Sequence, residues 1–230
     1  MALFTDAGIY FLAKWLHFFF GVMWIGHLYY FNFTQGTAIA QVEPANIRPN
    51  VLSKFLPVAL YWFRWGAMWT FVSGLVMISL RRESFHTMDN WAQVILVGAS
   101  FGTLMWANVW FVIWPNQKVV IQSNTQLASG GAALPEAAAC GARALVASRV
   151  NTLFSIPMLF FMGAARNLPI QMMPESPYMI FWVVFLALLV GLELFALKAK
   201  DPGPLKTVKS VIAAGFILTA IVYGLIEIIL

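Results

Sequence analysis

The sequence predicts an all-α membrane protein, a polytopic bundle of about six transmembrane helices that forms one domain over residues 1–230. Of these residues, 61% are hydrophobic and 10% are charged, whereas soluble domains average about 45–50% and about 25%. Six stretches of about 20 predominantly apolar residues are each long enough to cross a bilayer core. Backbone groups in lipid must be paired within their own segment, and the alternation typical of a membrane β-barrel is missing, so each stretch is predicted to be a helix.

The six predicted helices are joined by mostly short connections. Their ranges are Ile9–Phe31, Leu56–Leu80, Trp91–Trp114, Ala144–Gly163, Tyr178–Leu197 and Val208–Leu230. The first is not a cleavable signal peptide, because its apolar run is too long and no small-residue cleavage site follows. The longest connection, residues 115–143, is rich in small and turn-forming residues and is predicted to be a mobile loop containing at most a short helix. Its Cys140 is the single cysteine, which excludes an intramolecular disulfide.

The distribution of lysine and arginine predicts the orientation. The connections after the first, third and fifth helices carry about twice as many of these residues as the opposite side. The positive-inside rule therefore places the 115–143 loop in the cytoplasm of a bacterial inner membrane, with both termini in the periplasm. The net charge of +5 comes from these connections. Because the aromatic residues lie in the spans and not along a basic stripe, nucleic-acid binding is excluded.

Polar residues inside the spans are the candidates for a site, because a charge near the bilayer centre costs about 2.5–3.5 kcal/mol. Four of them lie at a similar depth near the inner ends of four helices: His27, Arg64, Asn108 and Glu193. They predict a catalytic cluster in the inner leaflet, with Arg64 and Glu193 as an ion pair. Alternatively, both charged side chains reach the headgroups separately, and Asn108 only bonds a neighbouring helix.

His17 lies in the outer half of the first helix, and Gly21 follows one turn later. A small residue there would let a flat macrocycle approach the helix, and histidine is a common ligand of haem iron. His17 is therefore the candidate metal ligand for haem b. His86, in the connection after the second helix, is the candidate partner ligand, and Met23, Met68 and Met105 are the alternatives. Alternatively, His17 is a hydrogen-bonding residue without a cofactor.

Four segments resemble motifs in the membrane domain of bacterial membrane-bound urate hydroxylases, the urate oxidase N-terminal family. They are "WLHFFFGVMWIGHLYYF", "LYWFRWGAMWTFVSG", "MWANVWFVIWPNQKVVI" and "NTLFSIPMLFFM", and they cover the first four predicted helices. His17 matches the family pattern, and Arg64 stands where the family has a basic residue, usually lysine. The other matching residues are Asn108, Asn116, Gln117 and Lys118.

The resemblance implies an inner-membrane oxidoreductase that converts urate to 5-hydroxyisourate and passes electrons to a fused cytochrome c domain. This sequence departs from that pattern: it has no Cys-x-x-Cys-His segment, and several histidines of the family are replaced. The family domain is also longer. We therefore expect a short form without the cytochrome domain, and His27 is an addition that belongs to this chain.

Two classes of function follow. In the first, the chain is a redox protein whose inner-leaflet cluster binds an anionic substrate or a quinone through Arg64. His27 transfers protons there, as suits a side chain that changes charge near neutral pH, and electrons leave to a separate cytochrome c or oxidase. In the second, the chain is a non-catalytic subunit of a larger membrane complex, and the small-residue stretch Gly98–Gly102 allows close approach of another helix. A transporter ranks third, because no inverted repeat is visible.

Overall fold

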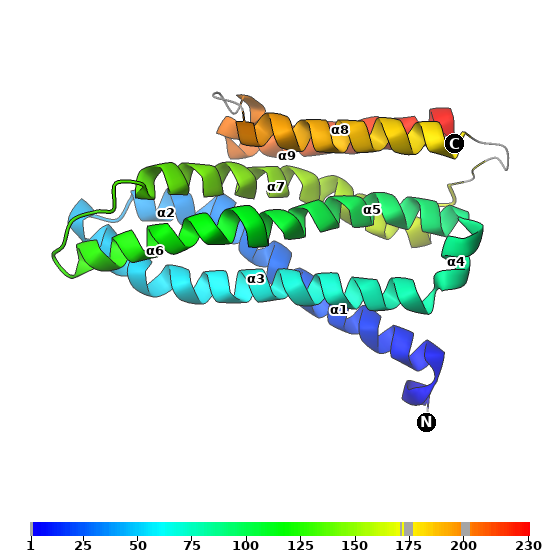
Figure 1. Cartoon of the computed structure of the whole chain (residues 1–230), viewed down its shortest axis with the longest axis horizontal. Coiled ribbons are helices and arrows are strands. Elements are labelled where there is room, and N and C mark those ends of the chain that lie inside the picture. Colours follow the sequence, from blue (N-terminus) through cyan, green and yellow to red (C-terminus); the bar gives the residue numbers. More distant parts are fainter. Residues whose placement is uncertain (1, 171, 173–176, 199–202) are drawn as a thin grey trace. The chain divides into compact units, whose positions relative to one another are not determined.

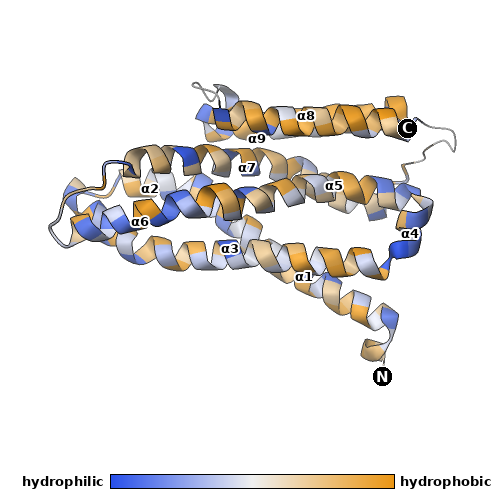
Figure 2. Ribbon diagram, viewed as in Figure 1, coloured by the Kyte–Doolittle hydropathy of each residue, from blue (hydrophilic) through white to orange (hydrophobic). Residues whose placement is uncertain are grey.

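The computed structural model describes residues 2–170, 172, 177–198 and 203–230, and these are almost entirely helical (Figure 1). Among the described residues, six helices are long and apolar enough to cross a membrane. This confirms the predicted all-α membrane class and the position of each of the six predicted spans. The apolar character is most continuous along α8 (Tyr178–Lys198) and α9 (Val208–Ile229), whereas the short helix α4 (Arg82–Thr87) is polar (Figure 2).

The remaining elements complete the order along the chain. A 3-10 turn, Ala2–Phe4, precedes α1 (Asp6–Tyr29), which continues through a π-helical segment, Tyr30–Gln35, into α2 (Gly36–Ala40). A second 3-10 turn, Ala45–Ile47, leads into α3 (Arg48–Leu80). The third span comprises α5 (Asn90–Ala107), a π-helical segment, Asn108–Ile113, and α6 (Trp114–Ala128). The fourth is α7 (Ala137–Asn167), and a last 3-10 turn, Gly203–Lys206, precedes α9.

The first four spans are longer than their apolar cores. The continuous helix Asn90–Ala128 has 39 residues, or roughly 58 Å at about 1.5 Å per residue, against a hydrocarbon core of about 30 Å. The prediction of a loop over residues 115–143 is therefore wrong for most of its length. Residues 115–128 and 137–143 are helical, and only residues 129–136 connect them.

The chain divides into two compact units. The first unit contains residues 1–80 and 106–148, in which α3 packs against both α1 and α6. Gly66 permits the close approach of α1 and α3, because a Cβ atom at this position would lie 3.1 Å from the Trp24 backbone nitrogen. Asn32 donates a hydrogen bond to the Ser148 hydroxyl over 2.8 Å, which ties the end of the first predicted span to α7.

The second unit contains residues 81–105 and 149–230. Its helices are held together by aromatic packing and by small residues: the Phe101 ring lies 5.6 Å from that of Phe185, and Gly98 faces Met162. The closest approach is at Gly215 of α9, where a Cβ atom would lie 2.9 Å from the Leu153 carbonyl oxygen. The Gly98–Gly102 stretch, which the sequence offered as a contact for a partner helix, therefore packs on α7 of its own chain.

Candidate functional site

The π-helical segment Asn108–Ile113 has a local cause in Pro115. Proline has no backbone N–H and cannot bond the carbonyl four residues earlier. The helix widens before it, and the Trp114 N–H bonds the Val109 carbonyl, five residues back. The Asn116 side chain then donates to the Val112 carbonyl over 2.7 Å. Such wide turns are rare and often mark functional sites, and Asn108 opens this one as a buried side chain.

A second asparagine supports the helix just before this segment, in the second unit. Asn151 of α7 is fully buried, and its side-chain amide donates to the Met105 carbonyl over 2.9 Å. This bond gives the Met105 carbonyl, three residues before the π-helical segment, a side-chain donor. Asn151 opens the "NTLFSIPMLFFM" motif, so its side chain has a direct structural role in positioning α5 against α7.

Arg64 of α3 is held by aromatic rings. Its guanidinium carbon lies 3.7 Å from the centroid of the Trp114 ring and 5.8 Å from that of Tyr61. Its Nη1 atom is buried and makes no hydrogen bond with any described residue. One turn towards Asn108, Trp110 meets Trp65 of α3 edge to face, with 5.7 Å between ring centroids. Arg64 is thus opposite Trp114, six residues beyond Asn108.

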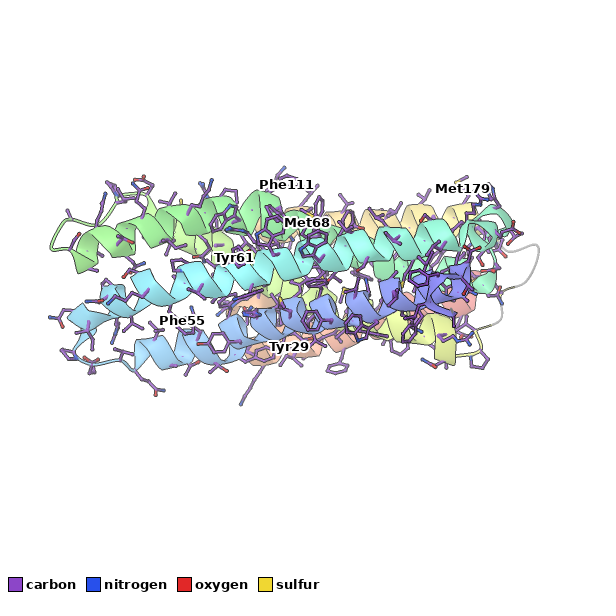
Figure 3. All side chains as sticks on the ribbon, turned by 90° about the horizontal axis from the view of Figure 1, so that it is seen from below. Tyr29, Phe55, Tyr61, Met68, Phe111 and Met179 are labelled. Atoms are coloured by element: carbon purple, nitrogen blue, oxygen red, sulfur yellow. The ribbon has the colours of Figure 1, made fainter. Side chains whose placement is uncertain are left out.

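A groove of about 250 Å³ lies on the surface formed by α1 and α3. Six side chains line it: Phe20, Met23, Tyr61, Trp62, Trp65 and Trp69. Trp62 and Trp69 are each nearly half exposed, and Tyr61 is visible on α3 in Figure 3. In the sequence, Trp62, Trp65 and Trp69 are spaced three and four residues apart and so share one helix face. Tryptophans at this spacing usually form a packing surface. Their partners on α1 could not be predicted from the sequence.

His17 is fixed between α1 and α3. Its Nδ1 atom lies 2.8 Å from the Thr70 carbonyl oxygen and 3.3 Å from the Ser73 hydroxyl. Since a carbonyl only accepts, Nδ1 carries the proton and Nε2 keeps its lone pair. The imidazole also needs Gly74, because a Cβ atom there would lie 3.3 Å from Cε1. A Cβ atom at Gly21 would lie 3.9 Å from Thr70 Cγ2 of α3, and the predicted role of Gly21 stays a prediction.

The other predicted residues have separate surroundings. His27 is half-buried, and its Nδ1 atom lies 2.7 Å from the Met23 carbonyl oxygen, whereas His86 is exposed on α4. Glu193 is buried in α8. Arg64 and His17 belong to the first unit, and Glu193 and His86 to the second. The Arg64–Glu193 ion pair and the His17–His86 haem site therefore stay predictions.

In the motif that follows Pro115, Gln117 has a buried side-chain oxygen without a hydrogen-bond partner among the described residues. Lys118 is exposed, and its Nζ atom lies 5.9 Å from the centroid of the Trp114 ring. Across the described ranges, no group of three or more histidine, cysteine or acidic side chains is close enough to hold a metal ion.

Arg149 is a polar residue that the sequence interpretation did not single out. Its Nη1 atom donates to the carbonyl oxygens of Leu205 and Lys206 over 2.6 and 2.7 Å. It thereby anchors the turn before α9 to α7. Its position five residues inside the fourth predicted span was the available indication, because a charge there requires a partner.

Comparison with known proteins gives one match. A family model described as "Urate oxidase N-terminal" matches residues 76–224, which is more than half of the chain. Searches of curated proteins and of solved structures found no match. The matched residues include Asn108, Asn116–Lys118 and Glu193 but begin after His17, His27 and Arg64. The resemblance noted in the first four helices is thus confirmed for the third and fourth, and the match extends through α8 into α9. The chain belongs to the urate oxidase N-terminal family.

Proposed function

We propose that this chain is a redox protein of the bacterial inner membrane, related in function to urate hydroxylases, with both termini in the periplasm. It takes two electrons and two protons from a urate-like substrate and water, and it passes the electrons to a separate acceptor. The family match supports the relation to urate hydroxylases. The observation that carries the redox role is the fixed orientation of His17 on α1.

The surroundings of His17 would suit a histidine that holds haem iron. Histidines that bind metals usually donate their second ring N–H to a carbonyl or carboxylate, which fixes the tautomer and turns the other nitrogen towards the metal. The bond from Nδ1 to the Thr70 carbonyl provides this arrangement and leaves Nε2 as the ligand atom. Gly74 leaves room for the ring, because a Cβ atom there would lie 3.3 Å from His17 Cε1. Haem b, when bound, supplies one-electron transfer.

Arg64 and His27 supply the polar groups for an anionic or carbonyl-bearing substrate. A guanidinium offers several N–H donors in one plane, and Arg64 Nη1 has no acceptor within the described residues. The bond from His27 Nδ1 to the Met23 carbonyl leaves Nε2 to exchange a proton. Asn108, a buried residue of the same unit, completes the proposed set of polar residues.

The visible spectrum of the protein purified in detergent tests the haem proposal. We expect a reduced-minus-oxidised haem band that disappears in His17→Leu and shifts in Gly74→Ala, since the added methyl group displaces the imidazole. Lys14→Leu, on the same helix, is the control and should leave the band unchanged. A colourless wild-type protein with normal helical content would overturn the haem proposal.

A separate measurement tests the substrate class. Membranes containing the chain should oxidise urate with an added electron acceptor, and Arg64→Leu should lower kcat/KM at least tenfold. If the haem band is present and urate is not consumed, the substrate class is wrong and the redox role stands. If the protein is colourless, inactive and always purifies with the same membrane partners, it is an accessory subunit of a larger complex.

A further inference from the structure

The groove between α1 and α3 differs from ordinary lipid-facing surface. Five of its six lining side chains are aromatic and the sixth is Met23, whose sulfur makes favourable contacts with rings. Phe20 and Trp69 face each other across the two helices with 6.1 Å between ring centroids. Trp65 and Trp69 stack along α3 at 6.3 Å. Walls of this kind suit a flat, conjugated ring.

The volume limits the size of the occupant. Pockets for drug-sized ligands range from about 300 to 1,000 Å³, and this groove holds about 250 Å³. A molecule of one or two fused rings fits this space, whereas a haem macrocycle does not. The groove is therefore separate from the haem proposed at His17, which is not among its lining residues.

Polar groups adjoin two of the residues that line the groove. On α1, His27 shares a helix face with Phe20 and Met23, at spacings of seven and four residues, so it continues the row one turn further. Its Nδ1–H is donated to the Met23 carbonyl, so Nε2 keeps its lone pair and can accept a hydrogen bond. On α3, the guanidinium of Arg64 lies 5.8 Å from the Tyr61 ring, which is a wall of the groove.

We infer that this groove binds the ring of a lipid-soluble quinone. The aromatic walls hold the ring, Arg64 donates a hydrogen bond to a carbonyl oxygen at the polar end, and the Nε2 lone pair of His27 accepts one from the hydroxyl of the quinol. The isoprenoid tail extends into lipid from the open face. The inference deepens the proposed function and depends on it for the electrons: two electrons and two protons from the substrate convert the quinone to a quinol, so the acceptor is a quinone in the membrane.

Binding can be measured without haem or urate. A decyl-tailed benzoquinone is titrated into the full-length protein in lipid nanodiscs, and quenching of tryptophan fluorescence gives the Kd. We expect saturable binding that Met23→Trp weakens at least tenfold, because the larger side chain fills the groove. Trp15→Leu is the matched control, since Trp15 is a half-exposed α1 residue outside the groove. Its Kd should stay within twofold of wild type.

Trp69→Ala removes a wall instead of filling the space, so it provides a second test if Met23→Trp does not fold. Decylbenzene, which has the ring and tail but no carbonyl, tests the polar end. It should compete at least ten times more weakly than the quinone, and His27→Leu together with Arg64→Met should abolish this preference.

Equal competition by decylbenzene would overturn the inference and identify a lipid-binding groove. Unsaturable quenching, or a Kd that neither Met23→Trp nor Trp69→Ala changes, would also overturn it. Failure of the haem proposal leaves the binding result intact, because a colourless protein can still bind the quinone. Conversely, a haem band that remains in Met23→Trp while quinone binding is lost shows that the two sites are independent.

Discussion

The two units of this protein use their polar and aromatic residues differently. The first unit holds eight of the ten tryptophans. Within the described residues it also buries seven side-chain nitrogen or oxygen atoms that make no hydrogen bond, carried by Trp24, Asn32, Gln35, Arg64, Trp106, Trp110 and Gln117. The second unit pairs the amide of Gln93 with the Trp182 indole at 2.9 Å and the amide of Asn151 with a backbone carbonyl.

The difference indicates a division of roles. A buried polar group without a partner costs about 1–3 kcal/mol, and several in one region of a native protein require an explanation such as bound water or a ligand. The first unit also contains the groove and the π-helical segment. The second is held by close glycine contacts and by the paired amides of Gln93 and Asn151, and among its described residues Arg149 Nε is buried without a hydrogen bond. We therefore expect ligands in the first unit and a scaffold role for the second.

The largest effect on stability should come from Gly215→Ala in the second unit. The added Cβ atom would lie 2.5 Å from Ile156 Cδ1 and 2.9 Å from the Leu153 carbonyl oxygen. The Ile156 side chain can turn away, but the backbone cannot, so α9 must move. We expect a loss of about 3 kcal/mol, measured by SDS-induced unfolding in mixed micelles.

Gly224→Ala on the same helix is the control, because a Cβ atom there meets nothing within 4 Å. It should be neutral or stabilising by up to about 1 kcal/mol. Equal effects of the two substitutions would show that the contact between α7 and α9 does not hold the second unit together.

Asn151→Leu should have the next largest effect. It leaves the buried Met105 carbonyl without its side-chain donor, which costs about 2 kcal/mol. Asn167→Leu is the comparison on the same helix, since Asn167 donates to the Gly163 carbonyl at an exposed position where water can replace it. Unfolding of both variants in the same micelles gives the difference, and similar losses would contradict a special role for the buried amide.

In the first unit, the contact between Arg64 and Trp114 should be worth about 1 kcal/mol, as is typical of a partly buried cation over an indole ring. A double-mutant cycle with Arg64→Met and Trp114→Leu measures it, because a true contact makes the double variant less destabilised than the sum of the single variants. Additive losses would show that the stacked geometry contributes nothing to stability.

Hydropathy was enough to predict the six spans, because length and apolar composition alone decide whether a helix can cross a bilayer. Hydropathy did not predict that the third helix continues as α6 past its apolar segment. This polar part is held by packing and by hydrogen bonds such as that from the Leu134 N–H to the Ser123 hydroxyl. Pro115 read as the end of the third helix, yet a wide turn absorbs its missing donor and the helix continues.

The candidate site was predictable only in its residue types. Arg64 and Asn108 were recognisable as polar residues in apolar segments, but the sequence could not show that the neighbours of Arg64 are aromatic rings. The groove requires two helices in register, and α1 supplies only two of its six side chains. Arg149 was missed because its partners are backbone carbonyls of a distant turn, which no side-chain pattern reveals.

The smallest expected effect is that of Lys118→Ala, and it tests whether the Asn116–Lys118 motif acts on a ligand or only supports α6. Lys118 is exposed, and its ammonium lies 5.9 Å from the Trp114 ring centroid, a distance at which a solvated cation contributes little. Its substitution should change the free energy of unfolding by less than about 0.5 kcal/mol. If urate oxidation falls while stability is unchanged, the lysine acts on a substrate or partner near the first unit. If neither changes, Asn116 alone accounts for the motif, because its side-chain amide stabilises the helix by donating to the Val112 carbonyl.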